Sequence, residues 1–224
     1  MDDTPGLRRD AEDNRMRLLA AAREVFAEHG TGATLHDVAR HAGVGVGTAY
    51  RRFANKQELL EAVMVQQVDD IEEILRTSLA NPDPWQSVVD YLESALEIQV
   101  RDRALGQIMA AQERTPAQLD TQRDRLAPLV DALMDRAIEH GVVRPDVTGT
   151  DLVFVQIGLV SIAATTRQHG PDSDSPAAEL YRRYLTIFLD GLKPKETLSS
   201  LPVRALTSDE VHQLLRRTLQ DVRR

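Results

Sequence analysis

The sequence predicts an all-helical protein with a small N-terminal domain joined by a long helix to a larger helical body. Apolar residues recur with a helical period along nearly the whole 224-residue chain, capping residues separate these runs, and no alternating run indicates a strand. With 42% hydrophobic and 28% charged residues, the composition is that of a globular protein with enough material for a core. The absence of cysteine excludes disulfides and thiolate metal sites.

Three helices are predicted before residue 54. An apolar stripe over residues 18–26 predicts the first helix, which Gly30 can end in a left-handed conformation. Thr34 and Asp37 form a capping-box pattern that opens a second helix of about two turns. A third short helix is expected over residues 45–53, after a turn so tight that it must join two crossing helices.

A long fourth helix is predicted after Asn55. Asn55 caps its start, with Glu58 in the reciprocal position of a capping box. Apolar residues then recur from Leu59 to Leu79 without an internal Gly or Pro. The run corresponds to about six turns, a length that suits a connecting rod.

Further helices are expected over residues 84–102, 103–114, 118–140, 151–168, 177–192 and 207–223. Pro128 kinks or starts the third of these helices. Residues 152–164 are apolar almost all round, which predicts burial on more than one side. Lys193 begins an irregular connector, and Thr207 with Glu210 opens the last helix.

Charge is distributed unevenly along the chain. The net charge is −8, yet acidic and basic residues balance over residues 1–60, so the whole excess of acid follows them. Residues 38–57 contain Arg40, Arg51, Arg52 and Lys56 and no acid. A local cationic segment in an acidic chain is typical of a small nucleic-acid-binding element on a larger body that does not bind nucleic acid.

The segment over residues 34–60 resembles the helix-turn-helix of the tetracycline-repressor (TetR) family of transcriptional regulators. Residues that match the family pattern are Thr34, Ala39, Gly43, Gly47, Thr48, Tyr50, Phe53 and Lys56. Close resemblance covers roughly residues 11–60, and the helical remainder is similar in length and layout only. The resemblance implies that Thr34, Thr48, Tyr50 and Lys56 hold DNA phosphates, and that Arg51 and Arg52 contact phosphates or a guanine.

Helix geometry supports a DNA-reading role for the third helix. At about 100° per residue, Ala49 and Phe53 share one face while Gly47 and Arg51 point the opposite way. The glycines at 45 and 47 allow close approach to DNA, Val46 can touch a thymine methyl, and Gly47 can meet a base edge. Gly45 departs from the family, which often has Ser there, so one phosphate contact is missing. The predicted DNA-binding residues are Thr34, Gly45, Val46, Gly47, Thr48, Tyr50, Arg51, Arg52 and Lys56.

By the same resemblance we expect a DNA-binding domain over residues 11–60, an effector-binding and dimerisation domain over 61–193, and a connector with a C-terminal helix over 194–224. The expected partners are double-stranded DNA with an inverted-repeat operator, a second copy of the chain, and an unidentified small molecule that releases a repressor. Dimerisation is expected through the helices 151–168 and 177–192, which would form a four-helix interface. We expect no cofactor, no metal and no membrane, and a cytoplasmic location.

Candidate effector-binding residues are the aromatic, soft or amide side chains on the body helices, with ordinary core packing as the alternative for each. They are Trp85, Tyr91, Met109, Gln112, Phe154 and Gln156.

Two other classes of function stay open at this stage. Asp69, Asp70 and Glu73 have the spacing of an acidic magnesium-binding cluster, which would suit an all-helical magnesium-dependent enzyme, although the exposed side of a helix explains them equally. A helical protein-interaction adaptor is the second alternative. Gly43, Gly45 and Gly47 imitate a dinucleotide-binding loop, but a helical pattern rather than a strand precedes them.

Overall fold

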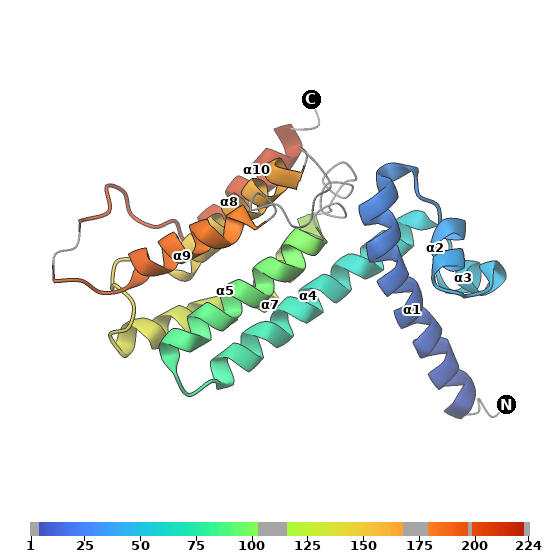
Figure 1. Ribbon diagram of the computed structural model, residues 1–224, viewed down its shortest axis with the longest axis horizontal. Helices are drawn as coiled ribbons and strands as arrows, with labels where there is room; N and C mark the ends of the chain where they lie inside the picture. The colour runs from blue at the N-terminus through green and yellow to red at the C-terminus, as the bar shows by residue number, and fades with distance from the viewer. Residues whose placement is uncertain (1–4, 103–115, 168–178, 197–198, 222–224) are drawn as a thin grey trace. The chain divides into compact units, whose positions relative to one another are not determined.

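The computed structural model describes residues 5–102, 116–167, 179–196 and 199–221, whose regular structure is entirely helical. In chain order the helices are α1 (Pro5–His29), a 3-10 turn (Gly30–Gly32), α2 (Leu35–His41), α3 (Val46–Arg52), α4 (Lys56–Ala80), α5 (Pro84–Arg101), α7 (Pro116–Glu139), α8 (Gly149–Arg167), α9 (Leu180–Leu192) and α10 (Ser208–Asp221) (Figure 1). The predicted all-helical class is confirmed. The helix expected over residues 103–114 lies outside the described residues.

The chain divides into two compact units. Unit 1 comprises residues 1–67 and 101–113, and unit 2 comprises residues 68–100 and 114–224. The α4 helix runs without a break from Lys56 to Ala80, so its first half belongs to unit 1 and its second half to unit 2. The predicted single rod is therefore present as one helix.

Unit 1 is built on α1, α2, α3 and the start of α4. Their inward side chains form one apolar core with Leu18, Phe26, Val38, Ala49, Phe53 and Leu59 among its buried members. Local signals end and begin the helices as the sequence predicts. Gly30 and Gly43 have positive φ angles of 59° and 63°, and the Asp37 amide donates to Thr34 Oγ1 at 3.2 Å while the Thr34 amide donates to Asp37 Oδ2 at 3.0 Å.

Unit 2 packs the rest of α4 with α5, α7, α8, α9 and α10 around a second core. The Arg136 guanidinium on α7 caps the end of α4 by donating to the carbonyl oxygens of Leu79 (2.8 Å), Asn81 (2.7 Å) and Pro82 (3.0 Å). The α7 helix continues through Pro128 and begins well before it, so Pro128 does not start this helix.

The α8 helix carries two apolar stripes on opposite sides. Leu152, Gln156, Leu159 and Ala163 are buried in unit 2, whereas Phe154, Ile157, Gly158 and Ser161 are exposed. Residues 149–166 are long and apolar enough, by length and composition alone, to cross a membrane. A core helix of a soluble protein passes the same test, and Leu152 and Ala163 are completely buried in this core.

The C-terminal α10 helix docks on α7. Val211 is buried, His212 Nε2 lies 2.6 Å from Asp120 Oδ1, and Arg123 Nη1 donates to Asp209 Oδ1 at 2.9 Å. The predicted capping box at its start is present, with the Glu210 amide donating to Thr207 Oγ1 at 3.2 Å.

Candidate nucleic-acid interface

The third helix of unit 1, α3, is oriented by the two apolar side chains on its inner face. Ala49 is completely buried and Phe53 is 3% exposed, and both contribute to the unit 1 core. Because α3 is anchored along this line, its opposite side must face outward. The Ala49 amide donates to the Gly45 carbonyl at 3.0 Å, which starts the helix without a side-chain cap.

Four residues form the exposed surface of α3, which we call the α3 face: Val46, Gly47, Tyr50 and Arg51. Val46 is 37% exposed and Tyr50 is 51% exposed, which is unusual for an apolar and an aromatic side chain. A Cβ atom added to Gly47 would meet no atom within 4 Å, so the glycine is not required by packing inside the unit. Arg51 donates to Thr48 Oγ1 at 3.0 Å, which holds both polar groups beside this face.

Two of the predicted DNA-binding cations also have contacts inside the protein. The Arg52 guanidinium is partly buried and donates to the Ala11 carbonyl oxygen of α1 at 2.5 Å. The Lys56 ammonium lies 5.1 Å from the centre of the Phe26 ring, a cation–π contact. Arg52 thus ties α3 to α1, and Lys56 ties the start of α4 to α1.

Thr34 is exposed at the start of α2, where its hydroxyl is engaged by the neighbouring carboxylate. Thr34 Oγ1 donates to Asp37 Oδ2 at 2.6 Å. The hydrogen bonds from the Thr34 hydroxyl and amide hold the pKa of Asp37 below its ordinary value. Thr34 is therefore a helix cap whose hydroxyl proton is donated to the Asp37 carboxylate.

Arg17 fixes the turn between α2 and α3, a role that the sequence did not reveal. Its Nη2 donates to the carbonyl oxygens of Ala42 at 2.6 Å and Gly43 at 3.3 Å. A second link from α1 joins His41 Nε2 to Glu24 Oε2 at 2.7 Å. Arg17 lies on the polar side of α1, where the apolar period gives no indication of a contact 25 residues away.

In unit 2 the structure brings together two of the proposed effector-binding residues. The Tyr91 hydroxyl of α5 and Gln156 Oε1 of α8 are 3.5 Å apart, and both residues are buried. Gln99, which the sequence reasoning missed, lies two turns after Tyr91 and places its Nε2 3.5 Å from the same oxygen. We call Tyr91, Gln99 and Gln156 the amide cluster.

The other candidates lie elsewhere or outside the described residues. Phe154 is 37% exposed on the outer stripe of α8, and Trp85 lies at the start of α5 with Lys193 Nζ 5.1 Å from its ring centre. Met109 and Gln112 lie outside the described residues. Of the four candidates among the described residues, Tyr91 and Gln156 are the two whose side chains are in contact.

Arginines bind Asp69, the first residue of the predicted acidic cluster on α4, and its neighbour Glu72. Arg125 of α7 donates to Asp69 at 2.7 Å and to Glu72, and Arg76 donates to Glu72 at 2.6 Å. The hydrogen bonds from Arg76 and Arg125 hold the pKa of Glu72 below its ordinary value. Within the described ranges, no group of three His, Asp or Glu side chains is arranged to hold a metal ion.

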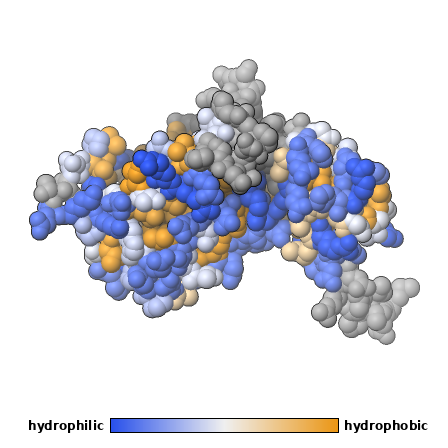
Figure 2. Space-filling view, viewed as in Figure 1, coloured by the Kyte–Doolittle hydropathy of each residue, from blue (hydrophilic) through white to orange (hydrophobic). Residues whose placement is uncertain are grey.

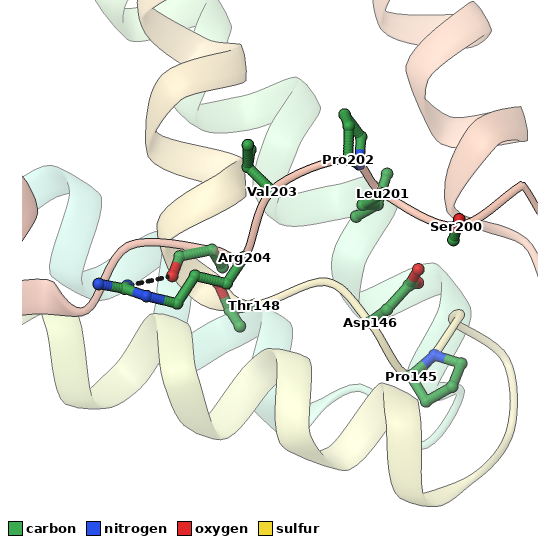
Figure 3. A pocket seen from close by; sticks show the side chains of 9 residues that line it. Pro145, Asp146, Thr148, Ser200, Leu201, Pro202, Val203 and Arg204 are labelled. Carbon is green, nitrogen blue, oxygen red and sulfur yellow. Dashed lines mark hydrogen bonds between the residues drawn. The ribbon is translucent and has the colours of Figure 1, made fainter.

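The C-terminal connector forms one side of an open surface pocket in unit 2, shown in Figure 3. On one side Pro145, Asp146 and Thr148 follow α7, and on the other the chain runs from Ser200 to Ala205. The Arg204 guanidinium turns to its neighbour's carbonyl, donating to Ala205 at 2.8 Å. Leu201 and Val203 are exposed, and the lining brings no set of polar groups to a common point.

Comparison with known families matches most of the chain. Residues 18–63 match the family described as bacterial regulatory proteins, tetR family, and residues 83–194 match the transcriptional regulator SbtR-like C-terminal domain. The HTH-type transcriptional regulator SrpR of Pseudomonas putida is 38% identical over 81 residues, which is 36% of this chain and 38% of SrpR. UidR of Escherichia coli K12 is 29% identical over 148 residues, covering 62% of this chain and 73% of UidR.

Solved structures agree over a larger share of the chain. A TetR transcriptional regulator from Streptomyces coelicolor has a TM-score of 0.63 and 28% identity, covering 80% of this chain and 98% of that one. A TetR regulatory protein from Mycobacterium vanbaalenii has a TM-score of 0.66 and 26% identity, covering 84% and 99%. The similarity therefore extends over both units.

Proposed function

The chain belongs to the TetR family of bacterial helix-turn-helix transcriptional regulators, and on that premise we propose that it is a homodimeric repressor, released from an inverted-repeat operator when a small molecule binds unit 2. Regulators of this family are not enzymes, so the arginine-bound acids of α4 have no catalytic role to fill. We place the protein in the cytoplasm, where bacterial DNA lies.

The observation that carries the proposal is the α3 face together with its charge. Val46, Gly47, Tyr50 and Arg51 are presented outward, on a stretch of 20 residues, 38–57, that contains no acid. A short helix of this size fits the major groove, where an apolar side chain can meet a thymine methyl and an arginine can bond a guanine or a phosphate. In this proposal the DNA backbone on either side of the groove is contacted by Thr34, Gly45, Thr48 and Lys56.

Arg52 has a different proposed part in the same interface. Since its guanidinium bonds the Ala11 carbonyl, it orients α3 against α1 and contributes positive potential. We therefore expect Arg51, rather than Arg52, to discriminate between bases.

The α8 and α9 helices pack against each other in unit 2. We propose the homodimer from the apolar stripe that each of these helices leaves exposed. Tyr184 and Ile187 of α9 are 44% and 56% exposed, and Phe154 and Ile157 of α8 are 37% and 44% exposed. Apolar patches also reach the molecular surface in Figure 2. A second copy would bury both stripes in a four-helix interface, with Gly158 allowing close approach.

Effector control follows from linkage. A small molecule lowers operator affinity only if it favours a conformation in which the two recognition helices of the dimer misfit successive major grooves. The continuous α4 helix, with residues in both units, is the proposed carrier of that change.

DNA binding is tested by selecting random duplex DNA on the purified protein, beside the double variant Arg51→Ala, Tyr50→Ala. We expect enrichment of an inverted repeat with half-sites about one helical turn apart, and loss of enrichment in the double variant. Arg76→Ala, which removes an exposed arginine from unit 2, is the matched control and should select the same sequence. If the wild type and the double variant select the same DNA sequence, the α3 face does not determine which sequence is bound.

The dimer is tested separately by sedimentation of Ile187→Arg. We expect the wild type to sediment as a dimer and the variant as a monomer of 25.0 kDa. Thr186→Arg, an equally exposed neighbour on a different side of α9, should remain dimeric. A monomeric wild type at micromolar concentration would remove the proposed interface.

A further inference from the structure

The inner stripe of α8 has a polar side chain where its neighbours are apolar. Gln156 is 6% exposed and lies between Leu152 and Leu159, which are 0% and 4% exposed. Among the described residues, its Nε2 has no hydrogen-bond partner. A buried amide nitrogen whose hydrogens stay unsatisfied destabilises the folded state, so an unpaired one calls for an explanation.

The two side-chain contacts of Gln156 among the described residues reach its oxygen and leave its nitrogen without an acceptor. The Tyr91 hydroxyl and Gln99 Nε2 both point to Gln156 Oε1, each at 3.5 Å, which is long for a hydrogen bond. Burial raises the pKa of Tyr91 to about 12, so its phenol keeps its proton at physiological pH. The amide cluster therefore holds hydrogen-bond donors that its own oxygen satisfies weakly.

Among the described residues, the buried neighbours of the amide cluster on α5 and α8 are apolar. Buried residues next to it on α5 and α8 include Leu92, Ala95, Leu96 and Ala163. The described charged side chains nearest in sequence are used elsewhere. Glu93 and Glu97 are exposed, and Asp90 accepts hydrogen bonds from Asn81 and Gln86. The exposed Arg101 pairs with the buried Asp102 at 3.3 Å. An ion placed here would lose its hydration without gaining a counter-charge, which is strongly unfavourable.

We propose that the amide cluster is the polar end of the effector site, and that the effector is an uncharged, largely apolar molecule whose carbonyl oxygen accepts hydrogen bonds from Gln156 and Tyr91. The inference rests on the proposed function and specifies its ligand class. A ketone, ester, lactone or amide supplies an acceptor for the Gln156 amide nitrogen, which has none among the described residues. A carboxylate or an ammonium ion of the same skeleton is excluded by its desolvation cost.

The first test uses matched small molecules and does not require DNA. Calorimetry on the full-length protein compares 2-alkanones of six to twelve carbons with the carboxylate and the primary amine of each length. We expect the ketones to bind at least about tenfold more tightly than either charged partner. Equal or tighter binding of the charged members, or the absence of ketone binding across the series, overturns the proposal.

The second test separates recognition from folding. Replacing Gln156 with Leu removes the unpaired amide, so we expect the melting temperature of the ligand-free protein to rise by about 2–4 °C, while the dissociation constant of the best ketone rises at least about tenfold. Tyr91→Phe should weaken the ketone and leave the melting temperature nearly unchanged. Gln86→Leu, the same exchange at an exposed position of α5, should change neither quantity.

Operator binding distinguishes this inference from the proposed function. Gln156→Leu should bind the selected DNA as the wild type does, because the α3 face belongs to unit 1. If the ketone binds and DNA stays bound, the release step of the proposed function fails while the ligand class stands. If Gln156→Leu melts at a lower temperature and still binds the ketone, the amide is a structural group and the proposal is wrong.

Discussion

The Arg17 guanidinium donates to the carbonyl oxygen of Ala42 at 2.6 Å, so the middle of α1 holds the end of α2 directly before the turn into α3. Arg17→Met removes this bond and the weaker one to Gly43 while keeping an unbranched side chain. We expect a loss of about 1–2 kcal/mol in the free energy of unfolding, measured with urea, and weaker operator binding. Arg15→Met, which removes an exposed pair with Glu12, should have little effect on either measurement. Equal losses in the two variants would show that Arg17 has no special role.

Arg136 should matter more for stability, because it satisfies three carbonyl oxygens in and just after the last turn of α4. Arg136→Met leaves these acceptors without their charged donor, and we expect the free energy of unfolding to fall by about 2–3 kcal/mol. Arg182→Met on α9 is the control, because the exposed Arg182 pairs with Glu179 at 3.2 Å and lies 5.5 Å from the Tyr181 ring centre but caps no helix end among the described residues. Urea unfolding of both variants beside the wild type provides the comparison, and similar midpoints for the two would contradict the capping role.

Gly149 marks a close contact between the start of α8 and α7. A Cβ atom there would lie 2.5 Å from Asp131 Oδ1, 3.0 Å from Val130 Cγ1 and 3.3 Å from the Asp131 amide nitrogen. We expect Gly149→Ala to lower the melting temperature by several degrees, because α8 or α7 must shift to admit the methyl group. Gly32→Ala, where an added Cβ meets nothing within 4 Å, should be neutral or slightly stabilising. If Gly149→Ala is as stable as the wild type, Val130 and Asp131 can move aside at little cost and the contact does not require glycine.

Docking of the C-terminal helix should weaken in acid. Hydrogen bonds from Arg204, and then from the Thr207 amide, lower the pKa of Glu210 from 4.5 to about 2. A lowered pKa means that the carboxylate stabilises the folded state above pH 4.5, and that this stabilisation is lost as the pH falls toward 2. The stability difference between the wild type and Glu210→Gln should therefore shrink over this range in urea titrations. It should also shrink in high salt, because the pair is exposed. A difference that is constant from pH 7 to pH 3 would disprove the assignment.

Local sequence signals predicted the helices and their ends well. The capping boxes at Thr34 and Thr207, the left-handed glycines and the inward position of Ala49 and Phe53 depend on residues within one or two turns of each other. Such contacts are determined by the helical period and by capping chemistry. They were enough to predict which side of α3 faces outward.

Contacts between distant elements could not be predicted in the same way. The resemblance implies a DNA contact for Arg52, but it gives no indication that the guanidinium also bonds a carbonyl oxygen 41 residues earlier. Arg17 and Arg136 likewise bond backbone atoms of other helices. The helical period also separates two of the effector-binding candidates. Phe154 and Gln156 are about 160° apart around α8, and the structure has Phe154 on the exposed side and Gln156 on the buried side.

Because α4 is unbroken, the number of residues in it determines the direction in which its later side chains point. A helix turns by about 100° and rises about 1.5 Å per residue. One residue inserted between Gln67 and Val68 would therefore turn the α4 side chains after the insertion by more than a quarter turn relative to those before it. An insertion of seven residues restores the rotation to within about 20° while lengthening the helix by about 10 Å. A hybrid that joins this DNA-binding unit to the body of another family member must therefore preserve helical phase at the junction.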